Sequence, residues 1–175
     1  MSGRIEPVAE RIFVGLGGNL GDPRRAMASA IRALSAAEGI EVVAVSSLYR
    51  TPPWGKTDQP DFLNAVAELR CLRQPRKLLE LCLETERSLK RERRERWGPR
   101  VIDIDILAFG DRVLAEPGLA VPHPRLAERA FVLVPLAEIA GDFVVARRRV
   151  SDMLADIDTS GIAVETAGDA WLAEP

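Results

Sequence analysis

The stretch VIDIDILAF, residues 101–109, alternates apolar and acidic residues in a way that predicts a β-strand with two different faces. Because successive side chains of a strand point to opposite sides, the three isoleucines would share one face, while Asp103 and Asp105 would share the other. Aspartate is a poor strand former. Two aspartates in an otherwise strong strand therefore indicate that the face they share has a functional role.

The chain on both sides of this strand predicts a regular order of strands and helices. We expect strands at 12–16, 40–49, 62–70 and 101–109, and helices that begin at Pro23 and Pro75. Asp22 would cap the first helix, and Gly39 would end it. The resulting order, strand-helix-strand-strand-helix-strand, is that of the ferredoxin-like split unit. The predicted fold class is therefore α+β, ferredoxin-like, with an antiparallel sheet, helices packed on one face and the ligand site on the other.

The remainder of the chain carries a weaker pattern. We expect a return strand at 112–114, a helix at 132–140, a strand at 143–146, a helix at 151–157 and a last strand at 162–165. The length of 175 residues suits one domain, and the sequence shows no internal repeat or low-complexity linker. We expect a single domain over 1–175, with a recognisable core at 12–140 and a C-terminal extension at 141–175.

The composition is typical of a soluble globular protein, with 47% hydrophobic and 29% charged residues. The net charge is −2, so the protein as a whole does not attract polyanions, and we expect no nucleic-acid partner. Cys71 and Cys82 lack metal-ligand spacing and predict reduced thiols. No apolar run approaches the ~20 residues of a membrane span, and the N-terminus has none long enough for a signal peptide. We therefore expect a cytoplasmic monomer without membrane contact.

The two aspartates have an ordinary and a chemical interpretation. Residues two apart on a strand are separated by roughly 6.5–7 Å. At that separation two carboxylates repel by about 0.6 kcal/mol in water and about 2.4 kcal/mol at an effective dielectric constant of 20, so a wet sheet face tolerates them. The sharper hypothesis is a magnesium site, because hard oxygen ligands hold cations that also bind phosphates. Two carboxylates can bracket two Mg²⁺ ions, which clamp both sides of an in-line displacement.

A basic segment comes just before the carboxylate strand. It holds seven basic residues against two acidic ones, namely Arg87, Lys90, Arg91, Arg93, Arg94, Arg96 and Arg100 against Glu92 and Glu95. Taken alone, such a run is more often a solvated helix end. Beside two carboxylates it favours a phosphate site, because arginine forks onto phosphate oxygens.

Three other features allow two interpretations each. GLGGNLGD at 15–22 lacks the lysine of a phosphate-binding loop and the third glycine of a dinucleotide fingerprint, so it predicts a tight turn. Asn19 within it could still offer an amide to a flat heterocycle. His123, the only histidine in the chain, lies between prolines and is either structural or a phosphate contact. Phe131 and Trp97 are either core residues or stacking residues.

Together these residues resemble the family of 6-hydroxymethyl-7,8-dihydropterin pyrophosphokinases. The matching blocks are GLGGNLGD, SSLYRTPPWGKTDQPDFLNA, RWGPRVIDIDIL and VPHPRLAERAFVLVPLAEIA, in the family's order and across residues 12–140. The resemblance implies the ferredoxin-like α+β fold. It also implies an enzyme of folate biosynthesis that uses two Mg²⁺ ions to transfer pyrophosphate from ATP to the pterin hydroxymethyl group, releasing AMP and the pterin diphosphate.

The resemblance further implies roles for individual residues. Asp103 and Asp105 would hold the metal ions, and Arg91, Arg93 and Arg100 would join them in catalysis. The ATP site would comprise Glu86, Arg91, Arg93, Arg96, Trp97, Arg100, Ile106, His123 and Arg129. The pterin site would comprise Gly18, Asn19, Thr51, Pro52, Pro53, Phe62, Asn64, Trp97 and Phe131, with Phe62 and Phe131 on the two sides of the ring. The chain departs from the family pattern at Gly18, Phe62, Lys90 and Pro124, where serine, tyrosine, glycine and tyrosine occur in other members.

Two other functions stand as alternatives. A nucleotidyltransferase also uses an Asp-x-Asp strand, but its Gly-Ser turn comes shortly before the aspartates, whereas the glycine turn here lies more than eighty residues upstream. Such an enzyme would release pyrophosphate instead of AMP. A ferredoxin-like RNA-binding module would use residues 87–100; against it stand the net charge, an aromatic content of 5% and the acidic pair.

Overall fold

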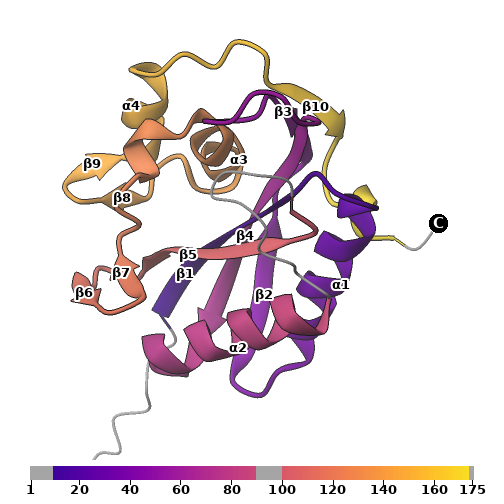
Figure 1. Cartoon of the computed structure of the whole chain (residues 1–175). Helices are drawn as coiled ribbons and strands as arrows, with labels where there is room; N and C mark the ends of the chain where they lie inside the picture. The colour runs from indigo at the N-terminus through magenta and orange to yellow at the C-terminus, as the bar shows by residue number, and fades with distance from the viewer. Residues whose placement is uncertain (1–9, 90–99, 174–175) are drawn as a thin grey trace, which may run out of the picture.

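The computed structural model describes residues 10–89 and 100–173, and its centre is a six-stranded antiparallel sheet (Figure 1). The strands are β1 (Glu10–Gly18), β2 (Ile40–Val45), β3 (Leu48–Thr51), β4 (Phe62–Cys71), β5 (Asp103–Phe109) and β10 (Ala163–Thr166). Five strands follow in the order β10-β3-β4-β1-β5, and β2 pairs with the part of β4 that β3 does not reach. β5 therefore ends the sheet on one side and β10 on the other.

Two helices, α1 (Pro23–Ala36) and α2 (Pro75–Ser88), cover one face of this sheet. α1 begins as predicted, because the Asp22 carboxylate accepts a hydrogen bond from the Arg25 backbone N–H at 3.1 Å. Their buried side chains, including Met27, Ile31, Leu34, Leu78 and Cys82, form one core with Ile12, Leu69, Ile104 and Ile106 of the sheet. The element order and the antiparallel pairing confirm the ferredoxin-like prediction.

A second helical layer lies on the opposite face of the sheet. α3 (Ala130–Ala140) and the short α4 (Val150–Ala155) form a separate core with side chains from that face. Phe13, Val66 and Leu107 supply the sheet side of this core, and Leu133 and Leu136 supply the α3 side. The face predicted to be open for a ligand is therefore partly covered, and only the part that α3 leaves free can hold a site.

An irregularity in β5 decides which of its side chains reach each layer. The pairing of β1 with β5 shifts between Phe13 and Val14, so Leu107 has no residue opposite it. Before this β-bulge the isoleucines of β5 enter the α1–α2 core as predicted. After it, Leu107 and Ala108 both enter the α3 core, and Phe109 returns to the first core. Strict alternation would have put Phe109 on the aspartate face, so the bulge resets the two faces of the strand.

The single strand predicted at 40–49 is wrong, because the chain forms two strands there, β2 and β3. They are separated by Ser46 and Ser47, which are both buried. The Ser46 hydroxyl accepts from the Val66 backbone N–H at 3.0 Å and donates to the Ser47 carbonyl at 2.8 Å. Short polar side chains thus replace the missing ladder partners and let the chain change strand without unsatisfied polar groups.

The return strand predicted at 112–114 is also wrong. After β5 the chain forms a separate hairpin of β6 (Leu114–Glu116) and β7 (Leu119–Val121), whose strands pair with each other. Four of the remaining elements lie near their predicted positions; they are α3, β8 (Val144–Val145), α4 and β10. The short elements η1 (Leu126–Glu128), β9 (Arg148–Arg149) and η2 (Ala170–Leu172) were not predicted.

Within the described ranges, no helix combines the length and the apolar character that a bilayer span requires. Cys71 and Cys82 are free and buried. Burial raises the pKa of the Cys82 thiol to about 12, so this group is a neutral part of the α1–α2 core.

Candidate active site

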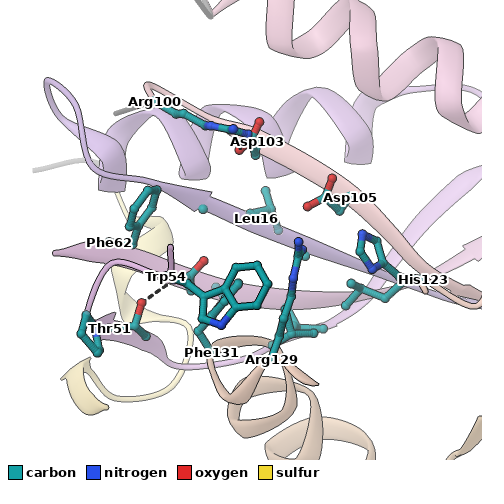
Figure 2. Close-up of a pocket in the computed structure, with 18 residues that line it drawn as sticks. Leu16, Thr51, Trp54, Phe62, Arg100, Asp103, Asp105, His123, Arg129 and Phe131 are labelled. Atoms are coloured by element: carbon teal, nitrogen blue, oxygen red, sulfur yellow. Dashed lines mark hydrogen bonds and ion pairs between the residues drawn. The ribbon is translucent and has the colours of Figure 1, made fainter. Parts of the chain in front are cut away.

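A pocket opens on the part of the sheet that α3 leaves uncovered (Figure 2). Its lining falls into two groups, a charged side and a neutral side. The charged side comprises Arg100, Asp103, Asp105, His123 and Arg129, and the neutral side comprises Thr51, Pro52, Trp54, Phe62, Asn64 and Phe131. All of these except Trp54 were predicted for the site, so the fold brings residues from four distant stretches of sequence to one cavity.

The carboxylates of the charged side are carried by β5. Asp103 and Asp105 both face the pocket, as the alternation predicted (Figure 2). An ion pair of 2.6 Å joins Arg100 Nη1 to Asp103 Oδ2. Arg129 is half-buried nearby; burial lowers the pKa of its guanidinium, while the charge of Asp105 opposes that shift. Arginine still remains protonated, so this side presents two negative and two positive groups.

The described residues contain no cluster of three or more His, Cys, Asp or Glu side chains that could hold a metal ion. A structural zinc site, which takes four protein ligands, does not fit this pocket. The aspartate pair does fit Mg²⁺, which usually takes one or two carboxylates and completes its shell with water and substrate phosphates.

His123 lies on the wall of the pocket beside β5. Its backbone N–H donates to the carbonyl of Leu107, the bulge residue, at 2.8 Å, and its Nδ1 accepts from the Arg125 backbone N–H at 3.1 Å. Since Nδ1 is an acceptor, the ring proton sits on Nε2. Burial, together with the charges of Arg129 and Arg125, lowers the pKa of His123 to about 4. At neutral pH the imidazole is therefore uncharged and offers one N–H donor.

The neutral side of the pocket is aromatic. Phe62 begins β4, Phe131 lies in the first turn of α3, and Trp54 lies in the loop after β3. The rings of Trp54 and Phe131 are 6.4 Å apart and tilted by 59°. The Arg129 guanidinium lies 5.2 Å from the Trp54 ring centre and 5.6 Å from that of Phe131, and Arg125 lies 5.4 Å from Trp54. These cation–π contacts join the neutral side to the charged side.

Thr51 and Asn64 supply the polar groups of the neutral side. Asn64 Nδ2 donates to Thr51 Oγ1 at 2.7 Å, and both side chains are buried. Gly17 lies opposite Asn64 on β1, where a Cβ would collide with Asn64 Oδ1. The glycine-rich stretch, predicted as a tight turn, thus begins as the end of β1. Its missing side chains let Asn64 lie across the strand.

A family model described as 7,8-dihydro-6-hydroxymethylpterin-pyrophosphokinase (HPPK) matches residues 13–141. The chain belongs to this family. The matched range contains every residue that lines the pocket. It also agrees with the range over which the sequence resembles the family, so the resemblance is confirmed.

Similar proteins carry the corresponding name. The 2-amino-4-hydroxy-6-hydroxymethyldihydropteridine pyrophosphokinase of Methylorubrum extorquens is 51% identical over 152 residues, which cover 87% of this chain and 96% of that protein. Its namesake from Pseudomonas aeruginosa is 42% identical over 154 residues, which cover 87% of this chain and 95% of that protein.

A solved structure supports the fold independently. The crystal structure of an HPPK-DHPS triple mutant from Plasmodium falciparum, with STZ-DHP, matches with a TM-score of 0.70 at 13% identity. The match covers 87% of this chain but 44% of that one, so this chain spans less than half of that protein. At this identity the likeness shows the fold alone.

Asn19 and Gly18, predicted for the HPPK pterin site, lie outside the pocket lining and hold its edge together. The Asn19 amide donates to Gln59 Oε1 at 3.0 Å and to the Pro60 carbonyl at 2.8 Å, and its Oδ1 accepts from the Arg100 N–H at 2.9 Å. Asn19 thus joins three segments of chain, and its contact with the pterin stays a prediction. Gly18 packs against the backbone just before β5, where a Cβ would not fit.

Three further predicted residues also lie outside the pocket lining. Glu86 is buried on α2, where its Oε1 accepts from the Ile104 backbone N–H at 2.8 Å. Ile106 belongs to the α1–α2 core, and Pro53 follows Pro52 in the loop after β3. Their roles in substrate binding stay predictions.

Part of the predicted ATP site falls outside the described residues. Arg91, Arg93, Arg96 and Trp97 belong to this part, so their roles also stay predictions. Arg100 is the described member of the same basic segment that was assigned to the site, and it lies in the pocket.

Trp54 is the aromatic residue of the pocket lining that the sequence did not single out. The sequence could have indicated it, because Trp54 lies in the loop TPPWGKTDQP, whose prolines and glycine exclude a regular helix or strand with one face in the core. A large aromatic side chain in such a loop has no helical or strand periodicity to satisfy, which favours a ligand contact over a core role.

Proposed function

We propose that this pocket is the active site of an ATP-dependent pyrophosphokinase, which transfers a pyrophosphoryl group to 6-hydroxymethyl-7,8-dihydropterin in folate biosynthesis. Membership of the HPPK family and the names of the relatives support this activity. The structural observation that carries the assignment is that the two β5 carboxylates face the same cavity as Phe62 and Phe131. The reaction needs such a site, with one side for a polyphosphate and one for a flat ring.

In this proposal the charged side binds the triphosphate. Asp103 and Asp105 would hold two Mg²⁺ ions, which supply positive charge against the phosphates and the departing AMP. A cation at Asp103 would compete with the Arg100 ion pair and so release the guanidinium for a phosphate oxygen. The neutral His123 would donate from Nε2 without any change of protonation state.

The neutral side would bind the pterin between Phe62 and Phe131. Stacking of a heterocycle on an aromatic side chain contributes about 1–3 kcal/mol per ring. Thr51 and Asn64 place a hydroxyl and an amide on this side, where they can meet polar atoms at the edge of the ring. A flat ring held in this way would direct its hydroxymethyl group towards the charged side.

The chemistry would be an in-line displacement. The pterin hydroxyl oxygen bonds to the β-phosphorus of ATP and loses its proton to water, the bond from that phosphorus to the oxygen bridging to the α-phosphorus breaks, and AMP leaves. We assign no side chain as a general base. Positioning and neutralisation of charge account for the catalysis, as is usual in phosphoryl transfer.

The direct test mixes the protein with ATP, Mg²⁺ and hydroxymethyl-dihydropterin and follows the nucleotide product. Release of AMP, dependent on the pterin, is the expected result. Release of pyrophosphate would instead indicate a nucleotidyltransferase. A salt-sensitive gel shift with oligonucleotides and no turnover of ATP would indicate an RNA-binding module.

We also propose that the enzyme is cytoplasmic and monomeric. Two free, buried cysteines are consistent with a reducing compartment. Sedimentation of the purified chain would measure its oligomeric state.

A further inference from the structure

The C-terminal part of the chain lies along the strand that leads into the neutral side of the pocket. β10 lies beside β3 (Figure 1). The two strands pair antiparallel, with Ala163 opposite Arg50. The other edge of β3 pairs with β4, where Thr51 lies opposite Phe62. Thr51 and Phe62 both line the pocket, so β3 is held between the C-terminal segment and the pterin side of the proposed site.

Side-chain contacts reinforce this pairing at the pocket end of β3. Arg50 donates twice to the Glu165 carboxylate, from Nε at 2.9 Å and from Nη2 at 2.7 Å. Before β10, Gly161 lies beside Pro52, where a Cβ on the glycine would be in van der Waals contact with the proline ring, 3.4 Å from its Cγ. Pro52 is itself part of the pocket lining. The segment therefore touches the pocket wall from behind.

The same segment is anchored at the other end of β3. The Trp171 side chain is fully buried in the α1–α2 core, and its Nε1 donates to the Ser46 carbonyl at 2.9 Å. The Gly168 backbone N–H donates to Ser47 Oγ at 2.8 Å. Both serines form the break between β2 and β3, so the segment fixes the point from which β3 starts.

We propose that residues 161–172, which we call the C-terminal brace, position β3 and thereby the pterin side of the active site. This inference rests on the proposed function. The brace lies beyond residues 13–141, the range that the family model matches. Because β5 ends the sheet on the side opposite β10, the brace acts on pterin binding and leaves the ATP side unchanged.

The test uses the Arg50–Glu165 ion pair, whose side chains are 47% and 39% exposed, so that changes there are tolerated by the fold. In Glu165→Arg the carboxylate is replaced by a like charge beside Arg50. The expected result is a rise of about three- to tenfold in KM for the pterin, with KM for ATP and the melting temperature nearly unchanged. The double variant Arg50→Glu/Glu165→Arg restores the pair in reverse and is expected to restore KM.

The matched control is Asp156→Arg, which breaks the exposed ion pair of Arg148 with Asp156 in the same C-terminal region, away from β3. It is expected to leave both KM values as in the wild type. If the wild type is active and Glu165→Arg behaves like this control, the brace proposal is wrong. Equal rises in both KM values would also overturn it, since that pattern indicates a general structural effect. Absence of pterin-dependent AMP in the wild type would instead refute the proposed function.

Discussion

The charged side of the pocket and its neutral side differ in how their side chains are brought together. The charged pair of Arg100 and Asp103 is made within one short stretch, and β5 then adds Asp105 two residues later. The neutral side takes Phe62 from β4, Phe131 from α3 and Trp54 from a loop, so it depends on tertiary packing. The comparison teaches that Arg100 and the two carboxylates of the charged side are encoded locally, whereas the neutral side exists only in the folded protein.

The most severe way to break the charged side is Asp105→Ala. Loss of this proposed ligand to the metal ions is expected to lower kcat by about a thousandfold or more, because metal stabilisation of the transition state is worth several kcal/mol. Asp105 is exposed, so the melting temperature should stay within a few degrees. The measurement is AMP release under saturating substrates. Asp111→Ala in the exposed turn after β5 is the matched control, and near-normal activity of Asp105→Ala would refute the metal assignment.

The corresponding change on the neutral side is Phe131→Ala. Removal of one stacking ring is expected to raise KM for the pterin by about tenfold to a hundredfold, with a smaller change in KM for ATP. Initial rates with each substrate varied in turn measure the two constants. Phe131→Leu keeps apolar volume without a flat ring, and it should behave like the alanine variant. A leucine variant with wild-type pterin KM would show that bulk, and not stacking, is what the site uses.

Trp54→Ala tests the place where the two sides meet. Loss of the contacts with Arg125 and Arg129, at 5.4 and 5.2 Å, is expected to raise both KM values by about two- to fivefold. Trp54→Phe retains a ring for the two cations and should lie close to the wild type. An effect on the pterin alone would separate the two sides and contradict a shared role of the indole.

The smallest expected effect concerns the pH dependence of stability through His123. The folded pKa of about 4 lies below the ordinary value of 6.5, so between these values the unfolded chain binds more protons. The stability that comes from the neutral ring is thus complete above about pH 6.5 and is lost as the pH falls towards 4. His123→Gln should therefore lose less in melting temperature between pH 7.5 and pH 5 than the wild type. An equal loss in both proteins would contradict the buried neutral imidazole.

The sequence predicted the elements whose signals are local. The alternation of β5 placed Asp103 and Asp105 correctly, and the pair of Asp22 and Pro23 marked the start of α1. These signals depend on strand pleating and on helix capping, which act over a few residues. The start of α2 was predicted in the same way, because this helix also begins at a proline, Pro75.

The parts that the sequence did not predict depend on contacts across the fold. β2 and β3 are separate strands because the Ser46 hydroxyl accepts a hydrogen bond from the Val66 backbone N–H. The hairpin forms because β6 and β7 pair with each other, and the sequence alone does not give the pairing partner of a strand. The packing of α3 and α4 against the second face of the sheet was also not predicted. That packing uses side chains from β1, β4 and β5, which form one surface only in the folded sheet. The hydrogen bonds of Asn19 were not predicted either, because they go to chain segments that come close only after folding.

The bulge at Leu107 has a consequence for how this protein tolerates change. One unpaired residue lets a seven-residue strand contribute side chains to the α1–α2 core, to the pocket through Asp103 and Asp105, and to the α3 core. The carbonyl of that residue also holds the histidine loop. Conservative replacements along β5 disturb one of these surfaces at a time. Removing a single residue there would turn every later side chain of the strand to the opposite face, so β5 should tolerate a conservative substitution better than a deletion.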